Sequence, residues 1–304
     1  MIPEKDNKGL QNDENTVVYR GMYEDTEKIK KLVIEEGIRE IGENAFRDYS
    51  CLTEIILPRS LEKISAAAFA GCKNLRRVAM EIGLTEIGDE AFSSCSSLLS
   101  VNMPDTVKRI GEGAFEGCAQ LTSLKLSESV YMIGAGAFAY CFNLTDVTVP
   151  SSCVLLEFNA FYSCFSLEAV KLSDNMALID ESTFEGCRSL KIVDMPARLK
   201  KIGRRAFTGC SSLVSLILPV GCEHIGYDAF SGCSSLRRIA IPKGMAELED
   251  DDIFSGCDSL LEISYGGSKE GFSALTRGEG IRIKRSDLTV AIPKIIFMDL
   301  KNEV

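Results

Sequence analysis

Residues 202–219 read IGRRAFTGCSSLVSLILP, and residues 225–242 repeat the pattern as IGYDAFSGCSSLRRIAIP. The interval is 23 residues, and the same interval separates the phenylalanines Phe46, Phe69, Phe92, Phe115, Phe138, Phe161, Phe184, Phe207 and Phe230. Phe254 follows one residue late. Self-similarity at such a period indicates an array of one small structural unit rather than a conventional globular domain.

Other residues recur at fixed distances from each phenylalanine. A cysteine stands three residues after it in nine units, and Tyr49 takes that place in the first unit. A leucine stands six residues after it, and two more apolar columns precede the next phenylalanine. Because one unit of this size cannot bury its apolar side alone, these columns predict a solenoid whose stacked units share a core. The phenylalanines are expected to stack along its axis.

Two periods occur within each unit. The segment from Ala114 to Leu121 has apolar residues at helical spacing, which predicts a short helix of about two turns. Val101 and Met103 alternate with a polar residue, which predicts a strand. Glycines such as Gly111 precede the helical segment and predict a tight turn with a left-handed backbone. The unit is therefore predicted to be strand, turn, extended segment, turn and short helix.

The pattern Ile-Gly-x-x-Ala-Phe-x-x-Cys-x-x-Leu-x-x-Ile-x-Leu-Pro resembles the BspA-like leucine-rich-repeat family of bacteria. The unit from Ile202 matches it almost throughout, with Leu216 in place of the second isoleucine. The resemblance covers about residues 38–265. It implies an α/β repeat solenoid, a leucine-rich-repeat right-handed superhelix with parallel strands on one face and short helices on the other. The asparagine or cysteine that follows the strand in commoner repeats is absent, since Ser60, Thr106 and Ser152 stand there.

The array has irregular ends. Strand-like segments at 16–19 and 31–34 predict an N-terminal cap, and those at 281–283, 288–292 and 294–298 predict a C-terminal cap. A linker to a further module is the alternative reading of the C-terminal segment. We expect four regions: a disordered segment at 1–15, an N-terminal cap at 16–40, about ten repeats at 41–265 and a C-terminal cap at 266–304.

Composition limits the compartment and the partners. The net charge of −10 argues against a nucleic-acid or anionic-membrane surface. No stretch is long and apolar enough to span a bilayer, and residues 1–11 lack the apolar core of a signal peptide. Either the protein is cytoplasmic or a leader has been removed. The family resemblance implies an exported or surface-displayed protein.

The twelve cysteines invite a disulfide or metal interpretation. Nine of them occupy one apolar column, and Cys153 and Cys222 occupy another, which favours buried free thiols. Stacked side chains point in parallel, a poor geometry for bridging. Only Cys51 falls outside the columns. The chain has no Cys-x-x-Cys pair and one histidine, so neither zinc nor any other cofactor is expected.

An acidic run at 249–252 offers a second candidate metal site. Its carboxylates could bind calcium, but the ligand spacing of a known calcium loop is lacking. A solvated acidic loop is the favoured interpretation.

Function must lie on outward residues, because the core columns are occupied. The strand residues between core positions change from rung to rung, and curved solenoids use such a face for extended recognition. The alternative is that these residues vary because they are solvated. Their mixed chemistry favours a protein or glycan ligand over a small-molecule pocket. The candidate ligand-binding residues are Glu54, Arg77, Asn102, Lys125, Asp146, Lys171, Asp194, Arg238 and Glu262.

Catalysis is disfavoured, because the single histidine, His224, lies in a partly solvated column and a regular repeat offers no cleft for a nucleophile. The leading prediction is a non-enzymatic binding scaffold, secreted or at the cell surface, that recognises protein or glycan ligands through its strand face. An intracellular interaction scaffold is an alternative, favoured by the missing leader and the reduced thiols. A structural spacer that displays another module is the other alternative.

Overall fold

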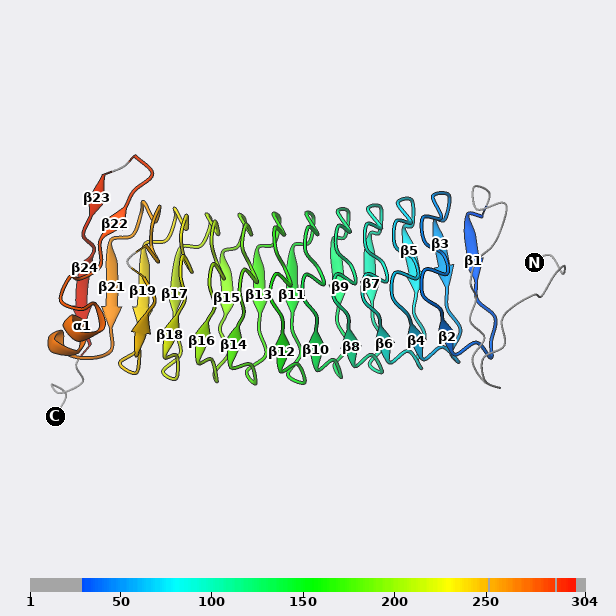
Figure 1. Cartoon of the computed structure of the whole chain (residues 1–304), viewed down its shortest axis with the longest axis horizontal. Helices are drawn as coiled ribbons and strands as arrows, with labels where there is room; N and C mark the ends of the chain where they lie inside the picture. The colour runs from blue at the N-terminus through cyan, green and yellow to red at the C-terminus, as the bar shows by residue number, and fades with distance from the viewer. Residues whose placement is uncertain (1–28, 251, 288, 299–304) are drawn as a thin grey trace.

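The computed structural model describes residues 29–250, 252–287 and 289–298. The chain forms a parallel-strand β-solenoid of about ten turns, stacked along one long axis, with the first and last described strands at opposite ends (Figure 1). Each turn, or rung, contributes one strand to each of two ladders. The repeated units predicted from the phenylalanine spacing are therefore confirmed as rungs of one solenoid.

The first ladder holds the odd-numbered strands of the repeats. Most neighbouring strands pair in parallel, as in the register Glu54↔Arg77, and the ladder divides into three hydrogen-bonded groups of successive strands. The strands are β1 (Lys31–Val33), β3 (Glu54–Ile56), β5 (Arg77–Ala79), β7 (Ser100–Asn102), β9 (Ser123–Lys125), β11 (Asp146–Thr148), β13 (Ala169–Lys171), β15 (Ile192–Asp194), β17 (Ser215–Ile217), β19 (Arg238–Ile241) and β21 (Glu262–Tyr265).

The second ladder holds two-residue strands, and it corresponds to the extended segment predicted within each unit. Its inward isoleucines stack in register, as in Ile64↔Ile87↔Ile110. The strands are β2 (Glu40–Ile41), β4 (Lys63–Ile64), β6 (Glu86–Ile87), β8 (Arg109–Ile110), β10 (Met132–Ile133), β12 (Leu155–Leu156), β14 (Leu178–Ile179), β16 (Lys201–Ile202), β18 (His224–Ile225) and β20 (Glu247–Leu248).

The predicted short helices on the other face are wrong. The segment that carries each phenylalanine is a series of turns, and among the described residues the one α-helix, α1 (Lys269–Leu275), follows the repeats. Two residues per rung adopt left-handed backbone angles, as at Gly136 (φ 59°) and Tyr140 (φ 60°). A right-handed helix cannot continue through such residues.

Backbone hydrogen bonds between rungs replace the bonds that a helix would make. The N–H of Phe138 donates to the carbonyl of Ala160 in the next rung at 2.9 Å, whereas a helix would direct it four residues back. Within the rung, the N–H of Cys141 donates to the carbonyl of Phe138, three residues back, at 3.3 Å. The helical spacing of apolar residues therefore reflects a coiled series of turns that buries one side.

The glycine that opens this segment serves a different purpose from the one predicted. Gly111 and Gly134 do not adopt left-handed angles. A Cβ at Gly111 would lie 2.5 Å from the backbone nitrogen of Asp89, and one at Gly134 would lie 2.7 Å from that of Glu112. These glycines allow the backbones of successive rungs to approach closely.

The phenylalanine stack is confirmed as the axis of the core. From Phe46 to Phe254 each ring lies nearly parallel to the next, with successive centroids separated by 5.2–5.7 Å and interplanar angles of 2–18°. These rings are at most 1% exposed. This offset stacking is the arrangement that aromatic quadrupoles favour.

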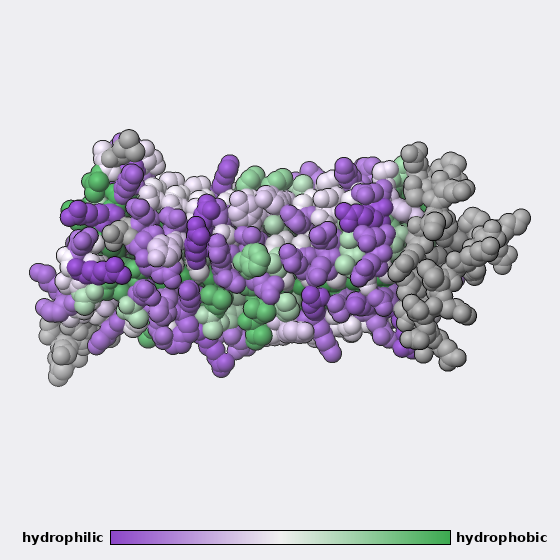
Figure 2. Space-filling view, viewed as in Figure 1, coloured by the Kyte–Doolittle hydropathy of each residue, from purple (hydrophilic) through white to green (hydrophobic). Residues whose placement is uncertain are grey.

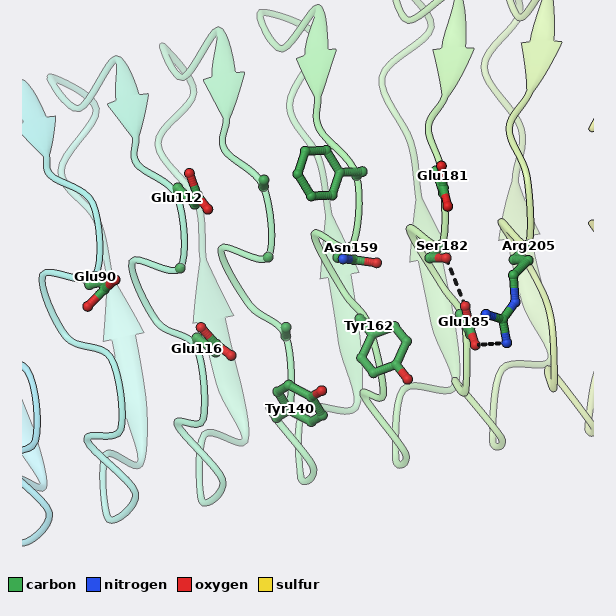
Figure 3. A pocket seen from close by; sticks show the side chains of 15 residues that line it. Glu90, Glu112, Glu116, Tyr140, Asn159, Tyr162, Glu181, Ser182, Glu185 and Arg205 are labelled. Carbon is green, nitrogen blue, oxygen red and sulfur yellow. Dashed lines mark hydrogen bonds and ion pairs between the residues drawn. The ribbon is translucent and has the colours of Figure 1, made fainter.

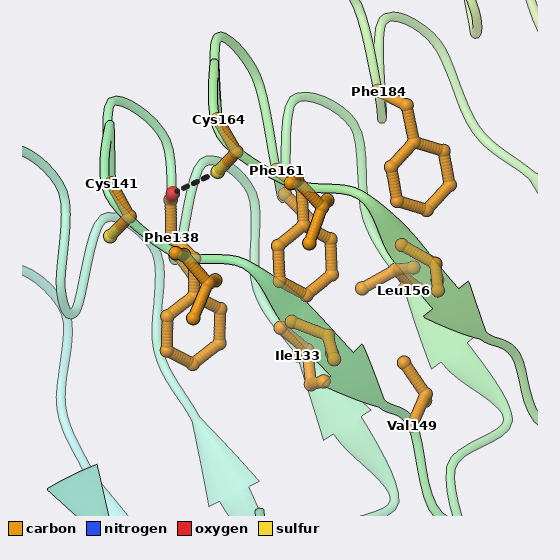
Figure 4. Packing of buried hydrophobic residues seen from close by; sticks show 14 of the residues in the cluster. Ile133, Phe138, Cys141, Val149, Leu156, Phe161, Cys164 and Phe184 are labelled. Carbon is orange, nitrogen blue, oxygen red and sulfur yellow. Dashed lines mark hydrogen bonds between the residues drawn. The ribbon is translucent and has the colours of Figure 1, made fainter. Parts of the chain in front are cut away.

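The cysteine column lies beside the rings. Cys164 Sγ donates to the carbonyl of Phe138 in the preceding rung at 3.2 Å, and the same contact recurs from Cys72 to Cys257 (Figure 4). Burial raises the pKa of the Cys164 thiol to about 12. All cysteines except the half-buried Cys51 are buried, as their columns predict. Each of the nine thiols from Cys72 to Cys257 in this column thus hydrogen-bonds a phenylalanine carbonyl inside the core.

Hydroxyl groups anchor the turn after the first ladder, where the sequence lacks the expected asparagine. Ser60 Oγ donates to the carbonyl of Ile38 at 2.8 Å, and Ser152 Oγ donates to the carbonyl of Val130 at 2.7 Å. Serine and threonine therefore link adjacent rungs at positions where commoner leucine-rich repeats use an amide.

The last rung is covered by elements that pack on its open edge. β24 (Lys294–Phe297) pairs in parallel with β21, while β22 (Ile283–Lys284) and β23 (Val290–Ala291) form an antiparallel hairpin that projects beyond the ladder (Figure 1). Helix α1 was not predicted. It begins where Ser268 Oγ accepts a hydrogen bond from the N–H of Gly271, a typical N-cap. The strand predicted at 16–19 lies outside the described residues.

Candidate functional site

The nine candidate residues all lie on the outer side of the first ladder. Each is adjacent to an inward residue of its strand, as Asn102 is to Val101, which is 2% exposed. Seven of the nine are exposed, and Glu54 and Glu262 are half-buried. Figure 2 shows one long face of the molecule, where hydrophilic side chains predominate and hydrophobic ones form small separate patches.

Register decides which candidates are neighbours. Asp146 lies opposite Ala169 of β13, so no candidate residue stands beside it on that neighbouring strand. Four pairs of candidates lie opposite each other on adjacent strands: Glu54 with Arg77, Asn102 with Lys125, Lys171 with Asp194, and Arg238 with Glu262. The first ladder therefore presents alternating charges at three places along its length.

One of these pairs is already an ion pair. Glu54 carboxylate oxygens lie 3.3 Å from Arg77 Nη2 and 3.3 Å from Lys31 Nζ. Both cationic side chains are more than half exposed, so each pair contributes at most about 1 kcal/mol. These charges remain accessible to a partner at little energetic cost.

The surroundings of His224 are those of a surface residue. Its Nδ1 lies 3.3 Å from Glu247 Oε2 on the neighbouring strand. The thiol of Cys222 lies close by, but Sγ faces the backbone carbonyl of His224 at 3.9 Å. Burial raises the pKa of that thiol to about 11, the opposite of the lowered pKa that a cysteine nucleophile needs.

The acidic run makes protein contacts of its own. Glu249 lies 3.4 Å from Lys201 Nζ and accepts a hydrogen bond from the N–H of Tyr227 at 3.3 Å. Asp251 lies outside the described residues. Across 29–250, 252–287 and 289–298, no group of three or more histidine, cysteine, aspartate or glutamate side chains is placed to hold a metal ion. In the same part of the chain, no helix is long and apolar enough to cross a bilayer.

Sequence reasoning missed a hollow of about 450 Å³ on the turn segments. None of its lining residues belongs to a strand. Its floor is formed by small residues that stand where other rungs carry larger ones: Gly113, Ala135, Gly136 and Ala139. Four of the five residues at 135–139 are glycine or alanine, which was the available sequence signal, but the periodic core pattern hid it.

Carboxylates flank the hollow on both sides (Figure 3). Glu90, Glu112 and Glu116 lie along one side, and Glu181 and Glu185 lie along the other. Glu185 is the one among them with a cationic partner: its Oε1 lies 2.7 Å from Arg205 Nη2, and its Oε2 accepts from Ser182 Oγ at 2.8 Å.

Aromatic side chains continue the surface at one margin of the hollow. We define the aromatic ridge as Tyr140, Phe142, Tyr162 and Phe165. Tyr140 packs edge-on against Tyr162 with ring centroids 5.3 Å apart, and Phe142 stacks on Phe165 at 4.9 Å. The guanidinium carbon of Arg188 lies 4.7 Å from the centroid of the Phe165 ring. None of these four residues occupies the core phenylalanine column.

Comparison with a family model identifies the repeats of this array. The model for the BspA type leucine rich repeat region (6 copies) matches residues 16–145 and 131–261. The chain belongs to this family. The resemblance in the sequence is thereby confirmed, and the two ladders and the phenylalanine stack are the form that the BspA-type repeat takes in this chain.

The BspA-type chain is similar to solved leucine-rich-repeat structures. A leucine-rich repeat protein from Bacteroides ovatus is 26% identical, with 90% of this chain and 85% of that chain covered and a TM-score of 0.48. The T. pallidum leucine rich repeat protein is 27% identical, with 67% and 86% covered and a TM-score of 0.49. A leucine rich cell surface protein from Faecalibacterium prausnitzii is 23% identical, with 88% and 95% covered and a TM-score of 0.42. No curated protein matches the chain.

Proposed function

We propose that this BspA-type protein is a non-enzymatic binding scaffold that recognises a protein or glycan ligand through the outer side of the first ladder. The observation that carries the proposal is the contrast between buried columns that keep their apolar character and outward residues whose chemistry varies along the ladder. Eleven strands spaced about 4.8 Å apart give a recognition face roughly 45–50 Å long. A face of that length suits an extended ligand.

The chemistry of the exposed residues supports a non-catalytic role. His224 pairs with a surface glutamate, and the nearest thiol has a raised pKa. A nucleophile–histidine mechanism requires a hydrogen-bonded pair with an activated nucleophile. The surroundings of His224 do not supply one.

An extracellular or cell-surface location is the second part of the proposal, and it rests on the family resemblance. The cysteine content, which favours a reducing compartment at first sight, is compatible with export. Cys153 and Cys164 are buried, and their raised pKa values leave almost no reactive thiolate at neutral pH. Fractionation of the native cells tests this part, and detection in the cytosol alone contradicts it.

The binding proposal is tested with a charge-reversed first ladder. Fluorescently labelled protein is applied to an array of glycans and extracellular matrix proteins, and R77E/R238E is compared with the control K108E/R198E. The control residues are exposed and lie outside the strands. We expect the R77E/R238E variant to bind its best array partner at least about tenfold more weakly, which corresponds to about 1.4 kcal/mol. Equal binding by all three proteins contradicts use of this face.

A further inference from the structure

The hollow on the turn segments has an excess of negative charge. Among its lining residues, five carboxylates face one guanidinium, and that guanidinium belongs to Arg205, which pairs with Glu185. In the described part of the chain, no cationic group lies within ion-pair distance of the carboxylates of Glu90, Glu112, Glu116 or Glu181. These four charges make the hollow attractive to a cation.

The carboxylates also disfavour one another. Burial raises the pKa of Glu116, and the charges of Glu90 and Glu112 raise it further. A bound cation would relieve this repulsion and stabilise the ionised carboxylates. Four carboxylates of the hollow therefore lack a neutralising positive charge from the described residues in the free protein.

Size and shape favour an organic cation over a metal ion. A volume of about 450 Å³ falls in the range of pockets that hold organic groups. Within the described ranges, the acidic side chains do not converge as metal ligands do. The floor is formed by glycine and alanine, and Tyr140, Phe158 and Tyr162 also line the hollow. Such walls suit an aliphatic stem that ends in a charged group.

The aromatic ridge extends the surface beyond the hollow and shares Tyr140 and Tyr162 with it. Tyr140 is exposed and the other three ridge residues are half-buried, and aromatic side chains are enriched at protein interfaces relative to the rest of the surface. The ridge already accepts one cation, since the guanidinium of Arg188 lies over Phe165. If a bound polypeptide placed a cationic side chain in the hollow, the residues beside that side chain would contact the aromatic ridge.

We propose that the hollow binds a lysine side chain of an extended basic peptide segment, with the residues beside that lysine on the aromatic ridge. Glu112 and Glu116 face the ammonium group, and Tyr140 and Tyr162 contact its aliphatic stem. The partner is thus a protein with an exposed lysine flanked by apolar residues. This site lies apart from the first ladder, so failure of the R77E/R238E test leaves it unaffected.

Fluorescence polarisation with three probes tests the site. The first probe is the labelled peptide acetyl-Ala-Leu-Lys-Leu-Ala-amide, the second is the same peptide with norleucine in place of lysine, and the third is free cadaverine as a competitor. We expect the norleucine peptide to bind at least tenfold more weakly. We also expect cadaverine to compete only at concentrations at least tenfold above those of the unlabelled lysine peptide.

Two double variants assign the binding to the hollow. E112Q/E116Q removes two charges with little change in shape, and it should weaken the lysine peptide at least tenfold. The matched control is E43Q/E128Q, because Glu43 occupies the repeat position of Glu112 three rungs away and Glu128 is exposed outside the hollow. The control should bind within twofold of the unmodified protein, and a thermal melt verifies that both variants fold.

A third variant, F142A/F165A, removes the two ridge residues that do not line the hollow, and it should weaken the peptide while leaving cadaverine competition within twofold. Three results overturn the proposal. These are equal binding of the norleucine peptide, unchanged binding by E112Q/E116Q, and cadaverine competition as strong as that of the peptide.

Discussion

Replacement of one ring in the phenylalanine stack should destabilise the solenoid strongly. Phe161 lies in the middle of the array, is 0% exposed, and stacks on Phe138 at 5.4 Å and on Phe184 at 5.7 Å. A buried phenylalanine removes roughly 150–250 Å² from water, which at about 25 cal/mol per Å² corresponds to roughly 4–6 kcal/mol. Alanine keeps part of that burial but leaves a cavity. We therefore expect Phe161→Ala to lower the free energy of unfolding by about 4 kcal/mol.

Urea unfolding followed by circular dichroism measures this loss. Because each rung contacts only its neighbours, the variant should also broaden the transition as the two halves of the array unfold less cooperatively. The matched control is Phe158→Ala. Phe158 lies in the same rung as Phe161, and it is 48% exposed. Because about half of the Phe158 side chain is already exposed to water, the control should lose no more than about half as much free energy of unfolding. If the two variants lose the same stability, the argument that the stack stabilises the solenoid is wrong.

Thiol labelling at pH 8 should modify Cys51 in the native protein long before the other cysteines. A pKa of about 11 leaves the buried Cys153 thiol roughly 0.1% ionised at that pH. Rapid labelling of all twelve thiols in the native protein would contradict the burial of the cysteine column. Glu116→Gln should raise stability slightly at pH 7, because the pKa of the folded carboxyl is raised and its ionised form is disfavoured. That gain should disappear as the pH falls below the unfolded pKa of about 4.3, where both proteins are neutral at this position, and urea titrations at pH 7 and pH 3.5 measure it. We propose that residues 16–40 and 266–304 cap the array. Removal of 266–304 should leave the outer edge of β21 without its partner β24 and cause self-association, visible by light scattering. A monodisperse truncated monomer would argue against the cap.

The repeat columns were predictable because buried positions recur at a fixed interval. Phe138, Cys141 and Ile133 lie in the core as their columns require, and apolar side chains fill most of the space enclosed by neighbouring rungs. The strand around Val101 was predictable from its local alternation. The C-terminal strands were also found near their predicted places, at β22, β23 and β24.

The helix prediction failed for a reason that local spacing does not reveal. Helices and coiled turns both bury residues three or four apart. The choice between them depended on the bond from Phe138 N–H to the next rung and on the left-handed angles at Gly136 and Tyr140. Helix α1 was missed because its seven residues are too short to show a period.

The candidate face could be placed from the sequence, whereas the hollow could not. The positions of Arg77 and Arg238 on an outward column follow from the alternation within a strand, so the sequence was sufficient to place them. Their use in binding is a proposal. The hollow depends instead on how the small residues at Gly113 and Ala139 leave space between larger neighbours, and no motif records such a gap.

The sequence by itself determined the repeat, its period and its buried columns, because these are properties of one unit copied along the chain. Only the tertiary structure decided which groups meet across units. Glu116 and Glu185 lie 69 residues apart, yet they line one hollow because stacking brings rungs together and small side chains leave the space between them open. The direction of the Phe138 backbone hydrogen bond was likewise settled by the neighbouring rung, which supplies the carbonyl that a helix would have taken from four residues back.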